Sequence, residues 1–239
     1  MGNNLNPAHN LRLDWVGFSV ARFACERWHY SGVIPAGKRV MVGAWEEGKF
    51  LGVVIFSTGA APQIGEPFGL KRTEVCELTR VALRYHRTPV SRIVAIAVRL
   101  LRRHAPGIRL VVSYADPLQH HHGGIYQAGN WLYLGRTKCS EHFFDTINLR
   151  FIHSKTLKTG KRGYATQLKA EDRIRSVRVW KHKYVLPLDD KLKPKLLLLS
   201  QPYPKRAPDQ TVLSFPEGKG GVKPTRTLHK TAEVQHGRD

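Results

Sequence analysis

The chain has 239 residues, of which 41% are hydrophobic, so it can bury a core and is not intrinsically disordered as a whole. It carries 39 Lys and Arg side chains against 18 Asp and Glu, which gives a formal net charge of +21. This excess predicts a polyanionic partner, most commonly nucleic acid, although a ribosomal or unspecific basic protein has the same composition.

Cysteine usage and hydropathy limit the compartment. Cys25, Cys76 and Cys139 have no C-x-x-C spacing, which argues against a disulfide framework or a zinc site built on cysteines. The N-terminus has no secretory signal pattern, and no apolar run approaches the roughly 18 residues that a membrane span requires. We therefore expect a soluble, cytosolic protein without a membrane partner.

The first half of the chain predicts one helix followed by strands. Apolar side chains recur at roughly helical spacing up to about Trp28, and Asp14 stands where an N-cap is expected. Two β-branched runs joined by Glu-Glu-Gly-Lys then have the pattern of a hairpin. The expected elements are a helix over 14–28, strands over 39–45 and 50–57, a loop over 60–71 and a strand over 74–83.

The second half predicts alternating helices and strands. Pro89 suits the first turn of an amphipathic helix whose arginines lie on the polar face. The expected elements are a helix over 89–103, strands over 108–114, 131–135, 143–153 and 177–187, and a short helix over 121–128. This order predicts an α/β or α+β domain with a mixed sheet flanked by helices.

The distribution of charge and of Pro and Gly suggests the domain boundaries. We expect a single domain over 1–205 and a basic, disordered tail over 206–239. Within the domain, the stretch 150–183 is rich in Lys and Arg and is the predicted surface for a phosphate backbone. Its candidate nucleic-acid contacts are Lys155, Lys158, Lys161, Arg162, Arg173 and Arg175.

The end of the first helix carries the first candidate site. His29 and Tyr30, in Trp28-His29-Tyr30-Ser31, can supply general acid and base groups. A helix end closed by packed aromatic side chains is the alternative interpretation.

A charged residue in an apolar strand is the second candidate. Strict alternation places Arg80 on one face of the strand together with Cys76, Leu78 and Ala82. A buried guanidinium needs an anion or carboxylate partner. The alternative is an edge strand with Arg80 in water.

The third candidate follows the strand over 108–114, since ligands in open α/β sheets bind at strand C-termini. Asp116, in Ser113-Tyr114-Ala115-Asp116-Pro117, is either a helix N-cap or a functional carboxylate. Three histidines follow it, and His29, Asp116 and His121 are candidate ligands for a metal whose presence the sequence leaves open. A helix from about His121 would place His122 and Tyr126 on one face.

Several of these segments, taken in order, resemble the Mom family of bacteriophage DNA-modification proteins. The resemblance covers roughly residues 10–205. The segments that carry it are Trp28–Ser31, Phe56–Ala60, Glu77–Leu83, Ser113–Pro117, and the spaced series His121, Gly123, Ile125–Ala128, Asn130, Trp131, Tyr133 and Gly135.

The resemblance implies both a fold and an activity. Mom proteins are distant relatives of the GCN5-type N-acyltransferases, whose fold is a splayed, mixed β-sheet flanked by helices. The implied enzyme is a transferase of the host cytoplasm that converts adenine in phage DNA to N6-carbamoylmethyladenine and so blocks host restriction. Its partner is double-stranded DNA, from which the target adenine is flipped into a pocket.

The resemblance also implies roles for the candidate residues. His29 or Asp116 accepts a proton from adenine N6, Tyr126 is the acid for the leaving group, and Arg80 holds an anionic group. Tyr30 and Ser113 complete the predicted catalytic set. The aromatic candidates for stacking on the base are Trp28, Tyr30 and Trp131.

The donor of the transferred group stays open. Relatives that bind acyl-CoA carry a Gln/Arg-x-x-Gly-x-Gly/Ala loop, whose backbone N–H groups hold the pyrophosphate. The corresponding stretch here, 84–92, lacks these glycines, which counts against ordinary acetyl-CoA. The candidate groups for phosphates of an acyl-CoA or of an aminoacyl-tRNA are Arg84, Arg87, Ser91 and Arg92.

Two other functions are compatible with the sequence. One is a diverged N-acyltransferase that acts on a small amine, a protein or RNA. The other is a non-catalytic DNA-binding regulator, which would leave the catalytic candidates without a shared purpose.

Overall fold

The computed structural model describes residues 10–59, 61–148, 150–153, 171 and 173–205. Their contacts divide the chain into two units. The first unit is Met1–Ser140 with Arg178–Val212, and the second is Glu141–Val177 with Leu213–Asp239. The predicted tail over 206–239 lies outside the described residues.

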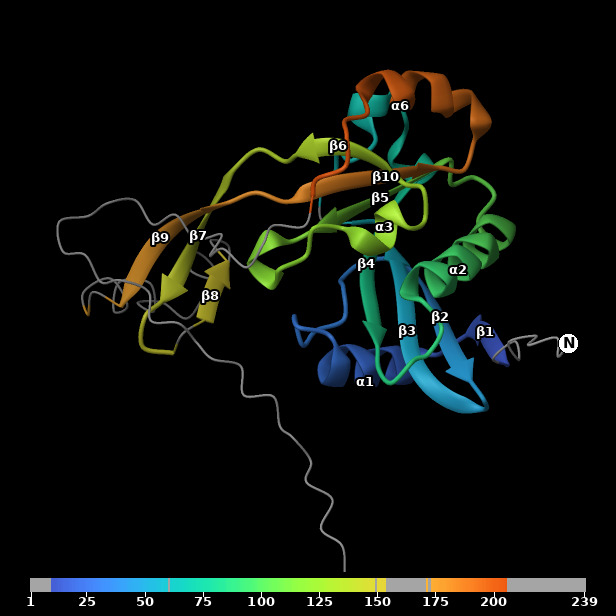
Figure 1. Cartoon of the computed structure of the whole chain (residues 1–239), viewed down its shortest axis with the longest axis horizontal. Coiled ribbons are helices and arrows are strands. Elements are labelled where there is room, and N and C mark those ends of the chain that lie inside the picture. Colours follow the sequence, from blue (N-terminus) through green and yellow to red (C-terminus); the bar gives the residue numbers. More distant parts are fainter. Residues whose placement is uncertain (1–9, 60, 149, 154–170, 172, 206–239) are drawn as a thin grey trace, which may run out of the picture. The chain divides into compact units, whose positions relative to one another are not determined.

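The first unit is built on a seven-stranded mixed sheet with the order β1-β2-β3-β4-β5-β10-β6 (Figure 1). Neighbouring strands are antiparallel except for β4 and β5, which are parallel. The strands are β1 (Leu11–Trp15), β2 (Arg39–Glu46), β3 (Lys49–Ser57), β4 (Val75–Leu83), β5 (Leu110–Ala115), β6 (Leu132–Arg136) and β10 (His182–Pro187).

Helices cover both faces of this sheet. Helix α1 (Phe18–Trp28) packs Ala21, Ala24 and Cys25 on one face of β3 and β4. Helix α2 (Val90–His104) packs its apolar side on the opposite face, as Figure 1 shows. Among the described residues, the remaining helical elements are α3 (Gly124–Gln127), α6 (Lys193–Leu199) and the single 3-10 turns Glu66–Phe68, Arg72–Glu74, Pro117–Gln119 and Asp190–Leu192.

Strands β4 and β5 separate soon after they pair. Their ladder begins at Val75 opposite Leu110 and ends at Glu77 opposite Val112. Beyond it the Ser113 hydroxyl donates to the Leu78 carbonyl, 2.9 Å away. The sheet is therefore mixed and splayed, which confirms the predicted fold class.

A β-bulge in β4 changes which residues share a face. Arg80 pairs with Ile55 and Leu78 pairs with Phe56, so Thr79 is the extra residue. Leu78 belongs to the core beneath α2, whereas Ala82 belongs to the core beneath α1. The prediction that Arg80 shares a face with Cys76 and Leu78 is therefore wrong, because alternation restarts at the bulge.

Other predicted elements differ in detail. The helix expected over 14–28 begins only at Phe18, since residues 11–15 form an edge strand, and Gly17 rather than Asp14 is its N-cap. The helix expected over 121–128 shrinks to α3, so His122 precedes it and does not share a helical face with Tyr126. The hairpin, the strand after it and α2 are confirmed.

The second unit contains a three-stranded sheet with the order β8-β7-β9. Its strands are β7 (Ser140–Asp145), β8 (Arg150–His153) and β9 (Ile174–Val179). The single strands predicted over 143–153 and 177–187 are each two strands, because a turn follows Asp145 in the first case and strand pairing is interrupted at residues 180–181 in the second.

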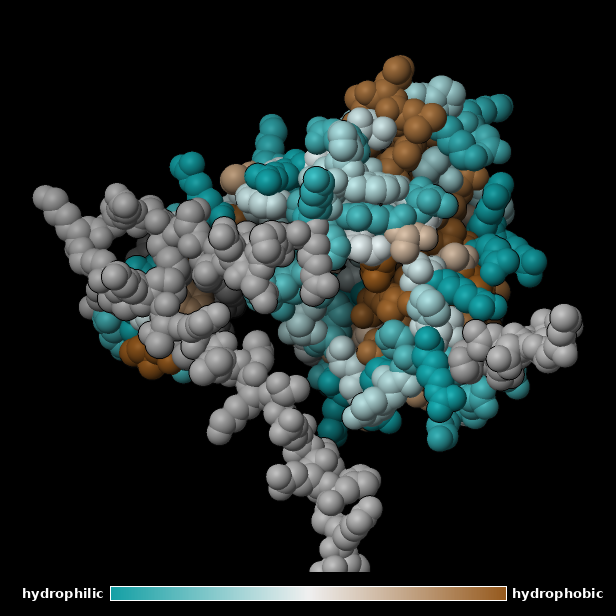
Figure 2. Space-filling model, in the orientation of Figure 1, coloured by the Kyte–Doolittle hydropathy of each residue, from teal (hydrophilic) through white to brown (hydrophobic). Residues whose placement is uncertain are grey.

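Helix α6 presents leucines to solvent. Leu197, Leu198 and Leu199 are 57%, 88% and 48% exposed, and Figure 2 shows this helix as a hydrophobic ridge. Within the part of the chain that the structure describes, no helix has the length and apolarity to cross a lipid bilayer.

The close pairing of β3 and β4 leads to a prediction about Gly52. This residue has φ +137°, and an added Cβ would lie 1.9 Å from the carbonyl oxygen of Ala82. We expect Gly52→Ala to lower the free energy of unfolding by at least about 2 kcal/mol, measured by urea denaturation. Gly107→Ala is the control, because nothing lies within 4 Å of its added Cβ; equal effects of the two substitutions would contradict the prediction.

Candidate active site

Aromatic and imidazole rings gather where α1 ends. His29 is the C-cap of α1, and its ring packs against Tyr30 with a centroid distance of 4.3 Å. The Tyr30 ring in turn meets His121 edge-on at 5.9 Å. The structure thus brings together two predicted site residues that follow α1 and one from the loop after β5.

His29 is held as a neutral imidazole. Burial is the main cause that lowers its pKa to about 4, and Arg80 and His121 act in the same direction. Its Nδ1 accepts the backbone N–H of Ser31 at 3.1 Å. Because Nδ1 is an acceptor, the neutral ring carries its proton on Nε2. Nδ1 already accepts from Ser31 and Nε2 already carries the ring proton, which disfavours His29 as the proton acceptor.

Tyr30 lies at the electrostatic centre of the cluster. Although 56% of the residue is exposed, burial of its phenolic end raises its pKa above the ordinary value. Four charged groups from three different segments also act on this pKa, and they are Lys181, Asp116, Arg80 and Glu77. The site therefore contains two carboxylates and two cations around one phenol.

Glu77 is a carboxylate that the sequence analysis did not select. Its charge helps to raise the pKa values of Tyr30, Tyr114 and Tyr126, with burial the larger cause for each. It occupies the last paired position of β4 before the strands separate. A Cβ on Gly59 would lie 2.6 Å from Glu77 Oε2, so the glycine in the Ser-Thr-Gly turn makes room for this carboxylate.

Asp116 has the predicted capping role, and it also forms an ion pair. Its Oδ1 accepts the N–H of Leu118 at 3.0 Å and caps the 3-10 turn that follows β5. Its Oδ2 lies 3.3 Å from Lys181 Nζ, and only 13% of the Asp116 side chain is exposed. Lys181 belonged to the predicted phosphate-binding stretch, but the structure places it beside this carboxylate.

Arg80 is fastened by backbone carbonyls rather than by a carboxylate. Its Nε donates to Val33 O at 3.1 Å, and its Nη1 donates to Thr79 O at 2.7 Å. The first of these bonds ties β4 to the loop that follows Tyr30. Arg80 therefore positions that loop and adds positive charge beside Tyr30 and His29.

Tyr126 and Ser113 form a buried hydroxyl relay at the point of splay. Their oxygens are 2.8 Å apart, and the Ser113 hydroxyl donates to Leu78 O. A serine hydroxyl has one proton, so Tyr126 is the donor in the bond between the two side chains. Burial, opposed by the bond to Ser113, raises the pKa of Tyr126 to about 12, so its phenol is protonated at neutral pH.

The metal candidates do not assemble as ligands. Among the described residues, no group of three or more His, Cys, Asp or Glu side chains is arranged to hold a metal ion. This applies to His29, Asp116 and His121, all of which the structure describes.

The loop before α2 does not fit the diphosphate of a CoA-type donor. The Glu46 carboxylate of β2 accepts the N–H groups of Arg87 and Thr88 at 2.8 and 2.9 Å, and the Thr88 hydroxyl at 2.5 Å. An anion already occupies these amides, and Glu46 is only 4% exposed. A negatively charged ligand cannot share these amides with the Glu46 carboxylate.

The aromatic candidates for base stacking differ in accessibility. Trp131 is 2% exposed and packs against Tyr126, so its ring belongs to the core and offers no face to a base. The Arg84 guanidinium lies over the Trp28 ring at 4.4 Å. Arg84 therefore stacks on an aromatic ring, whereas Ser91 and Arg92 lie in the first turn of α2.

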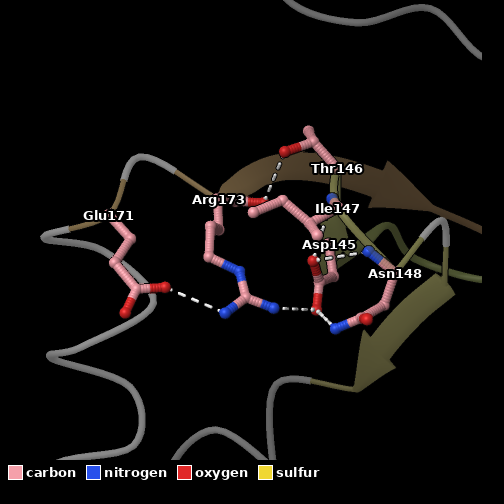
Figure 3. A network of polar contacts seen from close by, with 6 residues as sticks. All are labelled: Asp145, Thr146, Ile147, Asn148, Glu171 and Arg173. Atoms are coloured by element: carbon pink, nitrogen blue, oxygen red, sulfur yellow. Dashed lines mark hydrogen bonds and ion pairs between the residues drawn. The ribbon is translucent and has the colours of Figure 1, made fainter.

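Arg173 is occupied by a network within the second unit (Figure 3). Its Nη1 donates to Glu171 at 2.8 Å and its Nη2 lies 3.3 Å from Asp145 Oδ2. The pKa of Asp145 lies below its usual value, and the hydrogen bond from the Asn148 side chain is the largest cause. Arg173 thus stabilises the turn after β7, and its guanidinium has two carboxylate partners.

Of the remaining predicted contacts in the basic stretch, the structure describes one. Arg175 is exposed on β9. The other predicted contacts lie outside the described residues, and they are Lys155, Lys158, Lys161 and Arg162.

Phenol, carboxylate and imidazole groups gather where two parallel strands separate, an arrangement compatible with group transfer, and the chain is a transferase. It belongs to the Mom protein family, whose model matches residues 10–205. It is also 25% identical over 205 residues to the methylcarbamoylase Mom of Escherichia phage Mu, with 82% of this chain and 84% of that protein covered. The family resemblance seen in the sequence is thereby confirmed.

Solved structures of acetyltransferases are similar to this chain. One is the aminoglycoside 6'-N-acetyltransferase from Enterococcus faecium, with a TM-score of 0.42, 10% identity, and 74% of this chain and 96% of that chain covered. Another is an N-acetyltransferase from Staphylococcus aureus, with a TM-score of 0.39, 8% identity, and 74% and 97% covered.

The environment of His29 predicts an unusual titration. Its ordinary pKa is 6.5 and its pKa in the fold is about 4, so between these pH values the unfolded chain binds more protons than the folded one. Stability from this residue is therefore fully present above pH 6.5 and is lost as the pH falls toward 4. We expect its ring protons in an NMR titration to have a midpoint near pH 4, and His29→Gln to flatten the pH dependence of unfolding in this window. A midpoint near 6.5 would contradict the assignment.

The hydroxyl relay predicts an asymmetry between its two members. Ser113→Ala leaves both Leu78 O and the Tyr126 hydroxyl without their partner, so it is expected to cost about 1–3 kcal/mol in urea unfolding. Tyr126→Phe leaves the bond from Ser113 to Leu78 intact and should cost less. Ser200→Ala, at the exposed end of α6, is the control. A larger loss for Tyr126→Phe than for Ser113→Ala would contradict the assigned direction of donation.

Proposed function

We propose that this protein modifies adenine in double-stranded phage DNA to N6-carbamoylmethyladenine and so protects that DNA from host restriction. The observation that carries the proposal is the Mom family match over residues 10–205, combined with proton-transfer groups at the splay of β4 and β5. The net charge of +21 supports a DNA substrate, because phosphates attract such a surface.

The acceptor side of the reaction needs a base. The N6 amino group is a weak nucleophile whose lone pair is delocalised into the ring, so bond formation must be accompanied by loss of an N6 proton. Glu77 suits this role because its charge acts on three phenols at the splay. Asp116 forms an ion pair with Lys181 and accepts the Leu118 N–H. We therefore assign Glu77 as the group that accepts the N6 proton. Asp116 is assigned the role of positioning Lys181.

The donor side needs an acid. The bond from N6 to the transferred carbon forms as the bond from that carbon to the leaving group breaks, and the leaving group takes up a proton. Tyr126 is protonated at neutral pH and can release a proton if its hydroxyl turns from Ser113 toward the leaving group. The donor is an activated carbamoylmethyl compound, and the occupied loop before α2 argues that no diphosphate of it is held there.

Flipping gives the base access to this cluster. An adenine within the duplex cannot reach side chains of the site, so the nucleotide must leave the stack. Tyr30, which is 56% exposed and stacked on His29, offers an aromatic face at the entrance of the cluster.

The test is mass spectrometry of nucleosides from plasmid DNA of cells that express the full chain. We expect an adenosine that is heavier by one carbamoylmethyl group in place of a hydrogen. Glu77→Gln and Tyr126→Phe should each lower its rate of formation by about 10²–10⁴-fold, as loss of a proton-transfer group does. Asp190→Asn, on an 81% exposed side chain, is the control that should retain the product.

Each outcome separates the candidate functions. Unmodified DNA with soluble wild-type protein would contradict the proposal and favour transfer to a small amine, a protein or RNA. DNA binding without any modified nucleoside would favour a regulator. Full activity of Glu77→Gln with loss in Asp116→Asn would move the base to Asp116.

A further inference from the structure

The loop between β4 and α2, Arg84–Pro89, takes no part in the proton transfers and is tightly anchored. Glu46 holds the Arg87 and Thr88 amides, and Thr88 is only 3% exposed. His86 Nδ1 lies 2.9 Å from Thr88 O, which closes the loop on itself. An anchored loop of this kind keeps a fixed shape on the surface.

Tyr85 departs from the usual preferences in both exposure and backbone. Its φ is +47°, in the left-handed region that bulky side chains rarely adopt. It is also 88% exposed, so packing against the core does not offset the strain of this backbone conformation. Backbone strain of this kind concentrates at functional sites. The anchor at Glu46 keeps the neighbouring residues fixed in spite of it.

Tyr85 is the outer member of a continuous row of aromatic and arginine side chains. Arg84 lies over both Tyr85, at 5.2 Å, and Trp28, at 4.4 Å. Trp28 meets Phe23 edge-on at 5.4 Å, and Arg27 lies 5.8 Å from the Phe23 ring. This arginine–aromatic ladder consists of Arg27, Phe23, Trp28, Arg84 and Tyr85. It adjoins the candidate site, because His29 follows Trp28 in the chain.

The charge of the ladder defines its partner. Arg27, Arg84 and, beside them in the loop and in α2, Arg87 and Arg92 are all exposed. Guanidinium groups bind phosphates, and exposed aromatic faces stack on bases whatever their sequence. A surface that combines both suits nucleic acid better than an apolar protein partner. The alternative role for this loop is to bind a diphosphate through its backbone amides. Glu46 already accepts these amides, which excludes that role.

We propose that the arginine–aromatic ladder is the surface on which duplex DNA docks, and that Tyr85 stacks on the bases beside the extruded adenine. The inference rests on the proposed function for the choice of duplex DNA. Aromatic and apolar wedges at a disturbed base step offset the loss of stacking when a nucleotide leaves the helix. The fixed loop presents the wedge without a loss of conformational freedom on binding.

The experiment measures binding of the full chain to a fluorescent 20-base-pair duplex by anisotropy at several salt concentrations. Tyr85→Ala should weaken binding about ten-fold or more, the effect of losing one base stack, with an unchanged dependence on salt. Arg84→Met should lower the salt slope by about one, the effect of losing one phosphate contact. Leu198→Ala, which is equally exposed at 88% but lies on α6, is the matched control and should bind like the wild type.

A glycine variant separates binding from folding. Tyr85→Gly relieves the positive φ, so its melting temperature should be equal to or above that of the wild type, while its DNA affinity falls as in Tyr85→Ala. A duplex with 2-aminopurine in place of the target adenine reports extrusion by fluorescence, and the increase should be smaller in both variants.

Two results would overturn the inference. One is equal DNA affinity of the wild type and both Tyr85 variants. The other is tighter, Tyr85-dependent binding of single-stranded RNA than of the duplex. The nucleoside assay keeps the proposed function separate: a wild type that modifies DNA while Tyr85 variants bind normally contradicts only the ladder, and a wild type that binds through Tyr85 but modifies nothing contradicts only the enzyme.

Discussion

The early end of the parallel pairing between β4 and β5 is the constraint on which the site depends. After Glu77 and Val112 the two strands no longer share a ladder, and backbone groups that would have paired need other partners. Ser113 satisfies the Leu78 carbonyl and in turn receives the Tyr126 hydroxyl. The splay thus creates a gap in the sheet and fills its edge with groups that can move a proton. The same separation places Glu77 beside the gap.

Many of the charged side chains in this chain are held in place by specific partners. Inside the first unit, carboxylates fix particular groups: Glu46 holds the loop before α2, and Asp116 holds Lys181 beside Tyr30. The exposed guanidinium groups of Arg27 and Arg84 instead rest on aromatic rings. Stacking keeps a guanidinium oriented while its N–H groups stay available for phosphates. This arrangement gives a positively charged surface a defined geometry.

Stability and function oppose each other at the loop before α2. Three hydrogen bonds to Glu46 stabilise it, yet Tyr85 adopts a strained backbone and leaves its ring in water. Neither feature is explained by packing alone, since a glycine at position 85 would remove the strain. The two together are consistent with a rigid part of the surface that is shaped for a partner rather than for the fold.

The sequence by itself determined the hairpin, the strand after it, α2 and the family, because hydrophobic period and turn residues are local and ordered motifs accumulate specificity along the chain. It also selected His29, Tyr30, Ser113 and Tyr126, which the structure places around the splay. Only the tertiary structure decided the face of Arg80, since the bulge at Thr79 depends on pairing with β3. The surroundings of Glu77, Trp131 and Glu46 were likewise decided only by the tertiary structure. Whether a carboxylate faces a site, a core or a loop amide is set by strands distant in sequence, and no local pattern carries that information.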